Sequence, residues 1–113
     1  MSVTQSPLFS GLDDVVKRLI ESDTAIWNAE LRNRVIMFRG AHPDAIMTVL
    51  AIAPAFQKVF DNPLDHAVSE DIHCENADGT SCAWWDYFHP GQAIHKEVAI
   101  AMDERLKAMG FQY

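Results

Sequence analysis

The sequence predicts an α/β fold that is dominated by helices and has one or two short strands. Residues 10–38 and 91–109 carry apolar side chains every three or four positions, which is the spacing of a helix with one apolar face. Between these segments, residues 46–52 form a short, nearly continuous apolar run rich in β-branched side chains. Such a run is typical of a strand buried on both faces. A helix, a buried strand and further helices make half of an α/β pattern.

The first helix is expected to begin at Ser10, whose side chain precedes the apolar series and can cap the helix. Asp13 and Asp14 in the first turn, together with arginines near the end, complement the helix dipole. Gly40 is expected to end this helix, because glycine readily follows a last helical turn, and residues 42–44 then form a turn.

The rest of the chain is expected to contain more helix than strand. A short helix is predicted over residues 53–60, and the Asp-Asn-Pro sequence at 61–63 ends it. Residues 64–83 are polar and have no regular period, which indicates a long loop. The final helix, over residues 91–109, presents an apolar stripe and is expected to stop at Gly110.

Length and charge narrow the classes of function. The chain has 113 residues and a formal net charge of −7, and its nine lysines and arginines are scattered among sixteen acids. This length fits one domain at most, and the lack of a cationic patch argues against nucleic acid and anionic membranes as partners. No run of about 18 apolar residues occurs, so no transmembrane span is predicted. Residues 1–7 have neither the charged nor the apolar region of a signal peptide, so we expect no targeting sequence in this chain.

The most informative segment is residues 84–90, with the sequence WWDYFHP, just before the last predicted helix. Asp86 stands three residues ahead of His89, and Pro90 follows at once. This spacing suits a carboxylate that holds an imidazole in one tautomer, so that the other ring nitrogen can accept a proton from a nucleophile. A plainer interpretation is that Asp86 only caps the final helix, because the pattern Asp-x-x-His is common by chance.

Residues 86–95 resemble the C-terminal block of the SGNH (GDSL-type) acylhydrolases, and the Cys74–Cys82 loop with its aromatic pair resembles their secreted, fungal acetylesterase-like branch. The loop, helix and strand expected earlier in the chain follow one another as in the last third of those enzymes. The resemblance implies that residues 1–113 are the C-terminal part of a single SGNH-hydrolase-like domain. That domain would have a flavodoxin-like, three-layer α/β/α fold whose N-terminal nucleophile portion is absent from this sequence.

The same resemblance implies an enzyme that hydrolyses ester bonds. Its substrate would be a small ester, with acetyl esters of carbohydrates among the candidates, and no cofactor or metal would take part. Asp86 and His89 would be two members of a catalytic triad, with His89 as general base and then acid and Asp86 as the carboxylate that orients it. The intact parent would be extracellular.

A serine nucleophile for this triad is not evident. None of the serines lies in a Gly-x-Ser-x-Gly or Gly-Asp-Ser sequence; they are Ser2, Ser6, Ser10, Ser22, Ser69 and Ser81. Ser81 is close to the Asp-x-x-His pattern, but nothing predicts a strand-to-helix elbow there. Two hypotheses therefore stand: these residues belong to a serine esterase, or they form an inactive remnant or a protein-binding fragment. In the second case, the unpaired strand predicts self-association through an exposed sheet edge.

Cys74 and Cys82 are the two cysteines of the chain. Their spacing alone leaves open free thiols in a reducing compartment and a small disulfide-closed loop in an oxidising one. With His73 and His89 they offer a set of zinc ligands, but the close ligand pairs of structural zinc sites are missing, so no metal site is predicted. The resemblance to a secreted branch implies the disulfide, with α-carbons roughly 4.4–6.8 Å apart.

Overall fold

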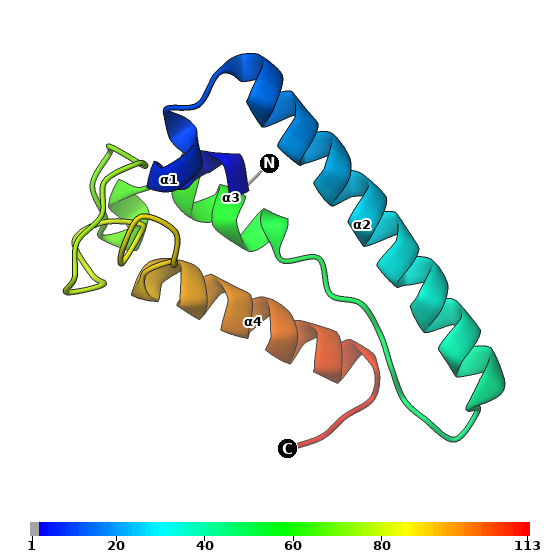
Figure 1. Cartoon of the computed structure of the whole chain (residues 1–113). Helices are drawn as coiled ribbons and strands as arrows, with labels where there is room; N and C mark the ends of the chain where they lie inside the picture. Colours follow the sequence, from blue (N-terminus) through cyan, green and yellow to red (C-terminus); the bar gives the residue numbers. More distant parts are fainter. Residues whose placement is uncertain (1–2) are drawn as a thin grey trace. The chain divides into compact units, whose positions relative to one another are not determined.

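The computed structural model of this chain describes residues 3–113 (Figure 1). Met1 and Ser2, and with them one of the serines considered as a nucleophile, lie outside the described residues. The elements in chain order are η1 (Val3–Gln5), α1 (Pro7–Ser10), α2 (Asp14–Ala41), α3 (Ala53–Asp61), η2 (Leu64–His66) and α4 (Gln92–Ala108). The chain divides into two compact units, of which one is Asp13–Leu50 and the other combines Met1–Leu12 with Ala51–Tyr113.

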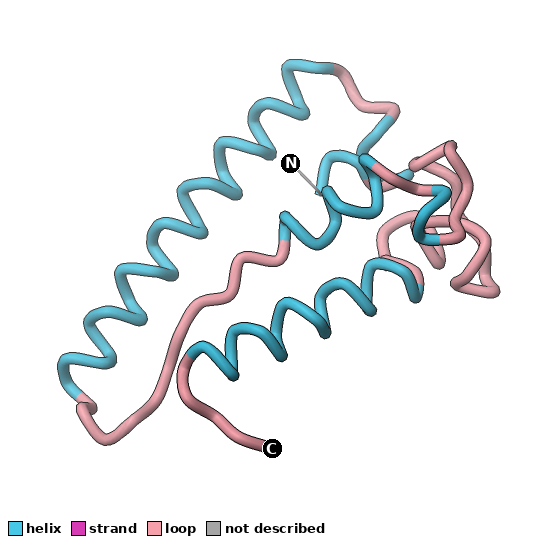
Figure 2. Tube along the Cα trace, turned by 180° about the vertical axis from the view of Figure 1, so that it is seen from behind, coloured by secondary structure: helices cyan, strands magenta, loops and turns pink. Residues whose placement is uncertain are grey.

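The predicted α/β fold is wrong. Residues 3–113 contain helices, turns and loops but no β-strand and no sheet, so a flavodoxin-like, three-layer α/β/α arrangement is absent from them (Figure 2). The expected strand at 46–52 is an extended connection into α3, and Ile46 is 71% exposed rather than buried. A strand must satisfy its backbone N–H and C=O groups on neighbouring strands, and the described chain offers this run no partner. The sheet edge expected to drive self-association is therefore absent as well.

The helix α2 lies where the apolar period predicted a long helix, but both of its ends differ. Its N-cap is Asp13, whose Oδ1 accepts a hydrogen bond from the backbone N–H of Val15 at 2.7 Å. Ser10 is instead the last residue of the separate helix α1, which Gly11 ends. α2 continues through Gly40 to a C-cap at His42. A glycine inside a helix costs about 1 kcal/mol relative to alanine, which one turn of continued hydrogen bonding can offset.

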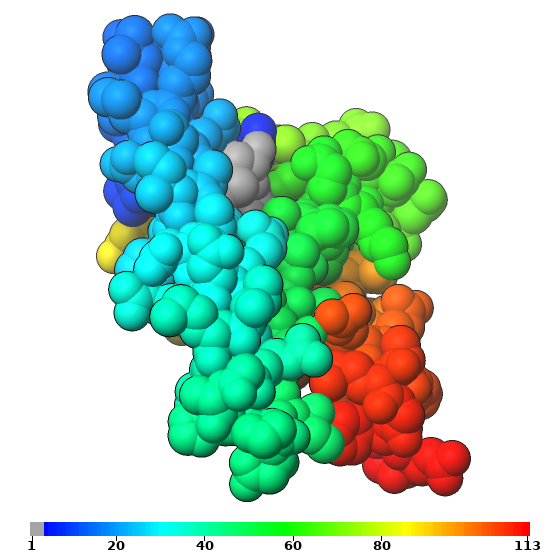
Figure 3. All heavy atoms as spheres, turned by 90° about the vertical axis from the view of Figure 1, so that its right-hand side faces the viewer, coloured from blue at the N-terminus to red at the C-terminus, as the bar shows by residue number. Residues whose placement is uncertain are grey.

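No side chain of α2 is buried, although its sequence has the apolar stripe of a core helix. Trp27 is 70% exposed, and Ile26, Ile36 and Met37 are exposed to a similar degree. In Figure 3, α2 carries its side chains on the molecular surface along its whole length. The sequence period therefore predicted the helix correctly, but it did not predict what the apolar face contacts. No helix of the described residues is both long and apolar enough to cross a lipid bilayer.

The core lies in the other unit, between α3, α4 and the loop that precedes α4. Val59 of α3 and Ile94 of α4 are fully buried, and Trp84 of the loop is 2% exposed. The Trp84 ring contacts Phe56 and Phe60 at centroid distances of 6.0 and 6.1 Å. Both helices lie within a residue or two of their predicted bounds. This core fixes the loop on which the candidate site residues lie.

Candidate active site

Asp86 and His89 lie on a tight turn that the Asp86 carboxylate itself holds together. Its Oδ1 accepts hydrogen bonds from the backbone N–H of Phe88 at 2.9 Å and of His89 at 2.6 Å. The turn is closed by the backbone N–H of Trp85, which donates to the carbonyl of His89 at 2.9 Å. An aspartate that bonds the backbone two and three residues ahead is a common way to fix a turn. The carboxylate therefore caps this turn and not the final helix, whose N-cap is Gly91.

The same carboxylate contacts the imidazole. His89 Nδ1 lies 2.8 Å from Asp86 Oδ2 and 3.0 Å from Oδ1. The backbone N–H groups of His89 and then Phe88, with a smaller effect of the His89 side chain, lower the pKa of Asp86 to about 2. A carboxylate that is ionised at neutral pH can only accept hydrogen bonds, so Nδ1 is assigned the proton. In the neutral imidazole, Nε2 then presents its lone pair, which is the state that a general base requires.

Two anchors tie this turn to the rest of its unit. Before the turn, Trp84 is in the core and its Nε1 donates to the carbonyl of Ile72 at 2.9 Å. After it, the backbone N–H of Gly91 donates to the carbonyl of Ala83 at 2.8 Å. A Cβ added at Gly91 would lie 2.9 Å from the carbonyl oxygen of Gly79, so only glycine allows this close approach of two backbone segments.

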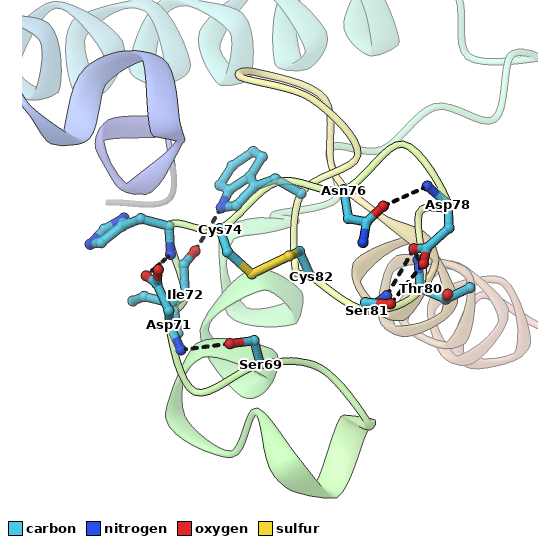
Figure 4. Close-up of a disulfide and its surroundings, with 11 residues drawn as sticks. Ser69, Asp71, Ile72, Cys74, Asn76, Asp78, Thr80, Ser81 and Cys82 are labelled. Atoms are coloured by element: carbon cyan, nitrogen blue, oxygen red, sulfur yellow. Dashed lines mark hydrogen bonds between the residues drawn. A yellow bond between two sulfur atoms is a disulfide. The ribbon is translucent and has the colours of Figure 1, made fainter.

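The predicted disulfide between Cys74 and Cys82 is present, with α-carbons 5.5 Å apart (Figure 4). Inside the closed loop, Asp78 accepts hydrogen bonds from Thr80 N at 2.7 Å, Ser81 N at 3.0 Å and Ser81 Oγ at 2.7 Å, and these bonds lower the pKa of Asp78 well below its usual range. Because both cysteines are bonded to each other, the alternatives of free thiols and of thiolate ligands to zinc do not apply to this structure.

The structure assigns Ser81 to the disulfide loop. Its hydroxyl donates to Asp78, and it lines a different hollow from the one beside His89. Ser10 Oγ donates to the carbonyl of Pro7 at 3.2 Å. Neither serine sits on a strand-to-helix elbow of the kind that exposes a nucleophile. The structure therefore offers neither Ser10 nor Ser81 as a partner of His89.

An open hollow of about 360 Å³ borders His89. Its lining includes Trp85, Gln92 and His95, as well as Asp78 and Gly79 of the disulfide loop. The side chain of His89 is 63% exposed and forms part of the lining of this hollow. A small molecule in the hollow would therefore meet an imidazole, an indole and polar side chains.

Three contacts between the first residues of the chain and the loop before α4 could not be predicted from the sequence pattern. The backbone N–H of Leu8 donates to the carbonyl of Tyr87 at 2.8 Å, and the Phe9 and Phe88 rings meet edge to face at 5.8 Å. His73 places Nδ1 2.8 Å from the carbonyl oxygen of Gln5. The first residues of the chain thus support the turn, although nothing in their sequence marks them as neighbours of it.

A comparison with known proteins relates this chain to ester hydrolases. Fifty-six residues, or 50% of the chain, are 39% identical to an acetylesterase of the fungus Thermothelomyces thermophilus. The match covers 18% of the length of that protein, so the chain spans a small part of its relative. No family model and no solved structure matches the chain.

Proposed function

We propose that this chain forms part of a serine ester hydrolase of the SGNH (GDSL) type, in which Asp86 and His89 are two members of the catalytic triad. The observation that carries the proposal is the contact of 2.8 Å between His89 Nδ1 and an ionised Asp86, which leaves Nε2 free to act. The similarity to an acetylesterase supports the choice of ester chemistry. The proposal concerns the site and not the fold, since the described residues contain no sheet.

In this proposal His89 Nε2 takes the proton of a serine hydroxyl as that oxygen attacks the ester carbonyl, and later gives the proton to the leaving alcohol. Asp86 keeps the imidazole in the required tautomer and stabilises the imidazolium that forms. The 113 residues contain no Gly-Asp-Ser sequence, so the serine and the oxyanion-hole donors would come from a segment outside them. The substrate would be a small ester such as an acetyl ester of a carbohydrate, and the intact enzyme would work outside the cell.

A chimera tests this proposal. A stretch of the Thermothelomyces thermophilus acetylesterase that has the length of this chain and contains the 56 matching residues is replaced by the chain, and p-nitrophenyl acetate hydrolysis is measured. We expect turnover that His89→Ala abolishes and that Asp86→Asn reduces about 10⁴-fold, because the amide favours the wrong tautomer. His42→Ala, in the other unit, is the matched control and should not change turnover. A folded, active chimera whose turnover survives His89→Ala would refute the proposal.

The second candidate is an inactive, protein-binding chain, and one observation favours it. The helix α2 exposes an apolar series over its length, and large exposed apolar surfaces often mark sites of association. Sedimentation velocity of the purified chain, compared with a Trp27→Ser, Met37→Ser variant, would detect association through α2.

For the isolated chain we expect p-nitrophenyl acetate hydrolysis that is no faster than that of its His89→Ala variant, because the base and the carboxylate act as a unit with a nucleophile.

A further inference from the structure

One wall of the hollow beside His89 takes no part in the proposed proton transfer: the indole of Trp85. The side chain is 50% exposed, and its ring centroid lies 6.5 Å from that of His89, with the two ring planes 63° apart. An indole is a large apolar surface, and leaving half of it in water is unfavourable unless something covers it. Its place next to the imidazole makes a substrate the natural candidate.

The indole is also held rigidly. Its Nε1 donates to the carbonyl of Ala77 at 2.7 Å, within the loop that the Cys74–Cys82 disulfide closes. Gly79, which has a positive φ of 68°, lies beside the ring, because a Cβ on it would be in ordinary van der Waals contact with Trp85 Cδ1 at 3.4 Å. A side chain that is already fixed loses little conformational entropy when a ligand binds, so more of the contact energy appears as affinity.

The chemistry of the histidine decides which part of an ester would reach Trp85. As general acid, His89 Nε2 must give its proton to the oxygen of the departing alcohol, so the alcohol lies beside the imidazole. Trp85 lines the same hollow together with Asp78 and Gln92, whose side chains can hydrogen-bond to hydroxyl groups. The acyl carbon, in contrast, must face the nucleophile.

We propose that Trp85 is a specificity-determining residue that binds the alcohol part of the ester, and that this alcohol carries a ring whose face stacks on the indole. The inference rests on the proposed role of His89. Aromatic and saturated rings share the flat apolar face that this contact needs, whereas an open-chain alcohol of similar size does not. The polar groups of the hollow favour a hydroxylated ring over a bare one.

Binding to the isolated chain tests this without any turnover. The ¹⁵N-labelled chain is titrated with two pairs of esters: an acetylated methyl pyranoside against glycerol monoacetate, and cyclohexyl acetate against hexyl acetate. We expect the Trp85 Nε1–H signal, assigned with Trp85→Phe, to shift with the ring esters, which should bind about three- to tenfold more tightly than their open-chain partners. Trp85→Ala should abolish this preference, and Trp27→Ala, which removes an exposed indole from α2, should leave it unchanged.

The chimera gives a second readout, the ratio of kcat/KM for the ring ester to that for the open-chain ester. Trp85→Ala should lower this ratio about three- to tenfold, while Trp85→Phe, which keeps a ring and loses only the hydrogen bond to Ala77, should largely preserve it. A ratio and a binding preference unchanged in Trp85→Ala would overturn the inference. So would loss of the preference in a Trp85→Phe chain whose disulfide and Trp84 signals are intact. Because binding is measured without catalysis, a failure of the triad proposal would be recognised separately by His89→Ala.

Discussion

Residues 69–91 contain no helix or strand, yet they bury Trp84, close a disulfide and hold Asp86 against His89. The helix α2 is 28 residues of regular structure and buries no side chain. The two regions differ in the origin of their order. In α2 the order comes from local backbone hydrogen bonds, whereas the loop combines local hydrogen bonds with contacts to distant residues, such as those of Trp84 with Phe56 and Phe60. A candidate site built in the second way should be the more sensitive to single changes.

The largest expected difference is in the loss of stability when each of two tryptophans is replaced by alanine. Trp84→Ala removes a side chain that is 2% exposed and should destabilise its unit by about 3–5 kcal/mol, because a cavity is left in the core. Trp27→Ala removes one that is 70% exposed and should cost about 0.5 kcal/mol or less. Amide hydrogen exchange measures the protection of each unit separately. Equal losses of protection in the two variants would mean that α2 contributes to a core after all.

Removal of the disulfide should have the next largest effect. The Cys74→Ser, Cys82→Ser chain loses a cross-link between residues 8 positions apart, and the loop-closure entropy predicts a loss of roughly 2–3 kcal/mol. The change should be seen in urea unfolding followed by amide hydrogen exchange of residues 69–91, with exchange in α2 as the internal control. If the variant unfolds at the same urea concentration as the parent chain, the loop is held by its hydrogen bonds alone.

The cap of α2 should matter less. Asp13→Ala removes the hydrogen bond of 2.7 Å to Val15 N and should destabilise the helix by about 0.5–2 kcal/mol. Asp13→Asn and Asp13→Ser keep a capping oxygen and serve as matched controls. We expect faster amide exchange over the first turns of α2 in the alanine variant, and no change in residues 69–91. An effect on the loop would show that the two regions are not independent.

The subtlest prediction concerns the ionisation of Asp86. Its folded pKa of about 2 is below the ordinary value of 3.8, so the stability that it contributes is fully present above pH 3.8 and is lost as the pH falls through about 2. In a ¹³C titration of its carboxylate, His89→Ala should raise the midpoint only slightly, because the backbone N–H groups dominate the shift. A return to 3.8 in that variant would mean that the imidazole, and not the turn, sets the ionisation.

Several features followed from the sequence because they depend on neighbours along the chain. The apolar period located α2 and α4, and the Asp-x-x-His spacing brought Asp86 to His89, since three residues of turn are enough to join them. The disulfide expected from the family resemblance is also short-range. Capping was harder to predict, because Asp13 and Ser10 are both good N-cap residues and only the separate helix α1 decides between them.

The tertiary structure decided the rest. An apolar run such as 46–52 becomes a strand only if another strand satisfies its backbone, and no described segment does so. Apolar character alone could not place Trp84 in the core and Trp27 on the surface, because burial depends on what packs against a side chain. The contact of Leu8 with Tyr87 joins residues far apart in the chain, and the hollow beside His89 forms only where the disulfide loop meets the start of α4. The sequence by itself determined the local turn that pairs a carboxylate with an imidazole, and folding over long distances decided what surrounds it.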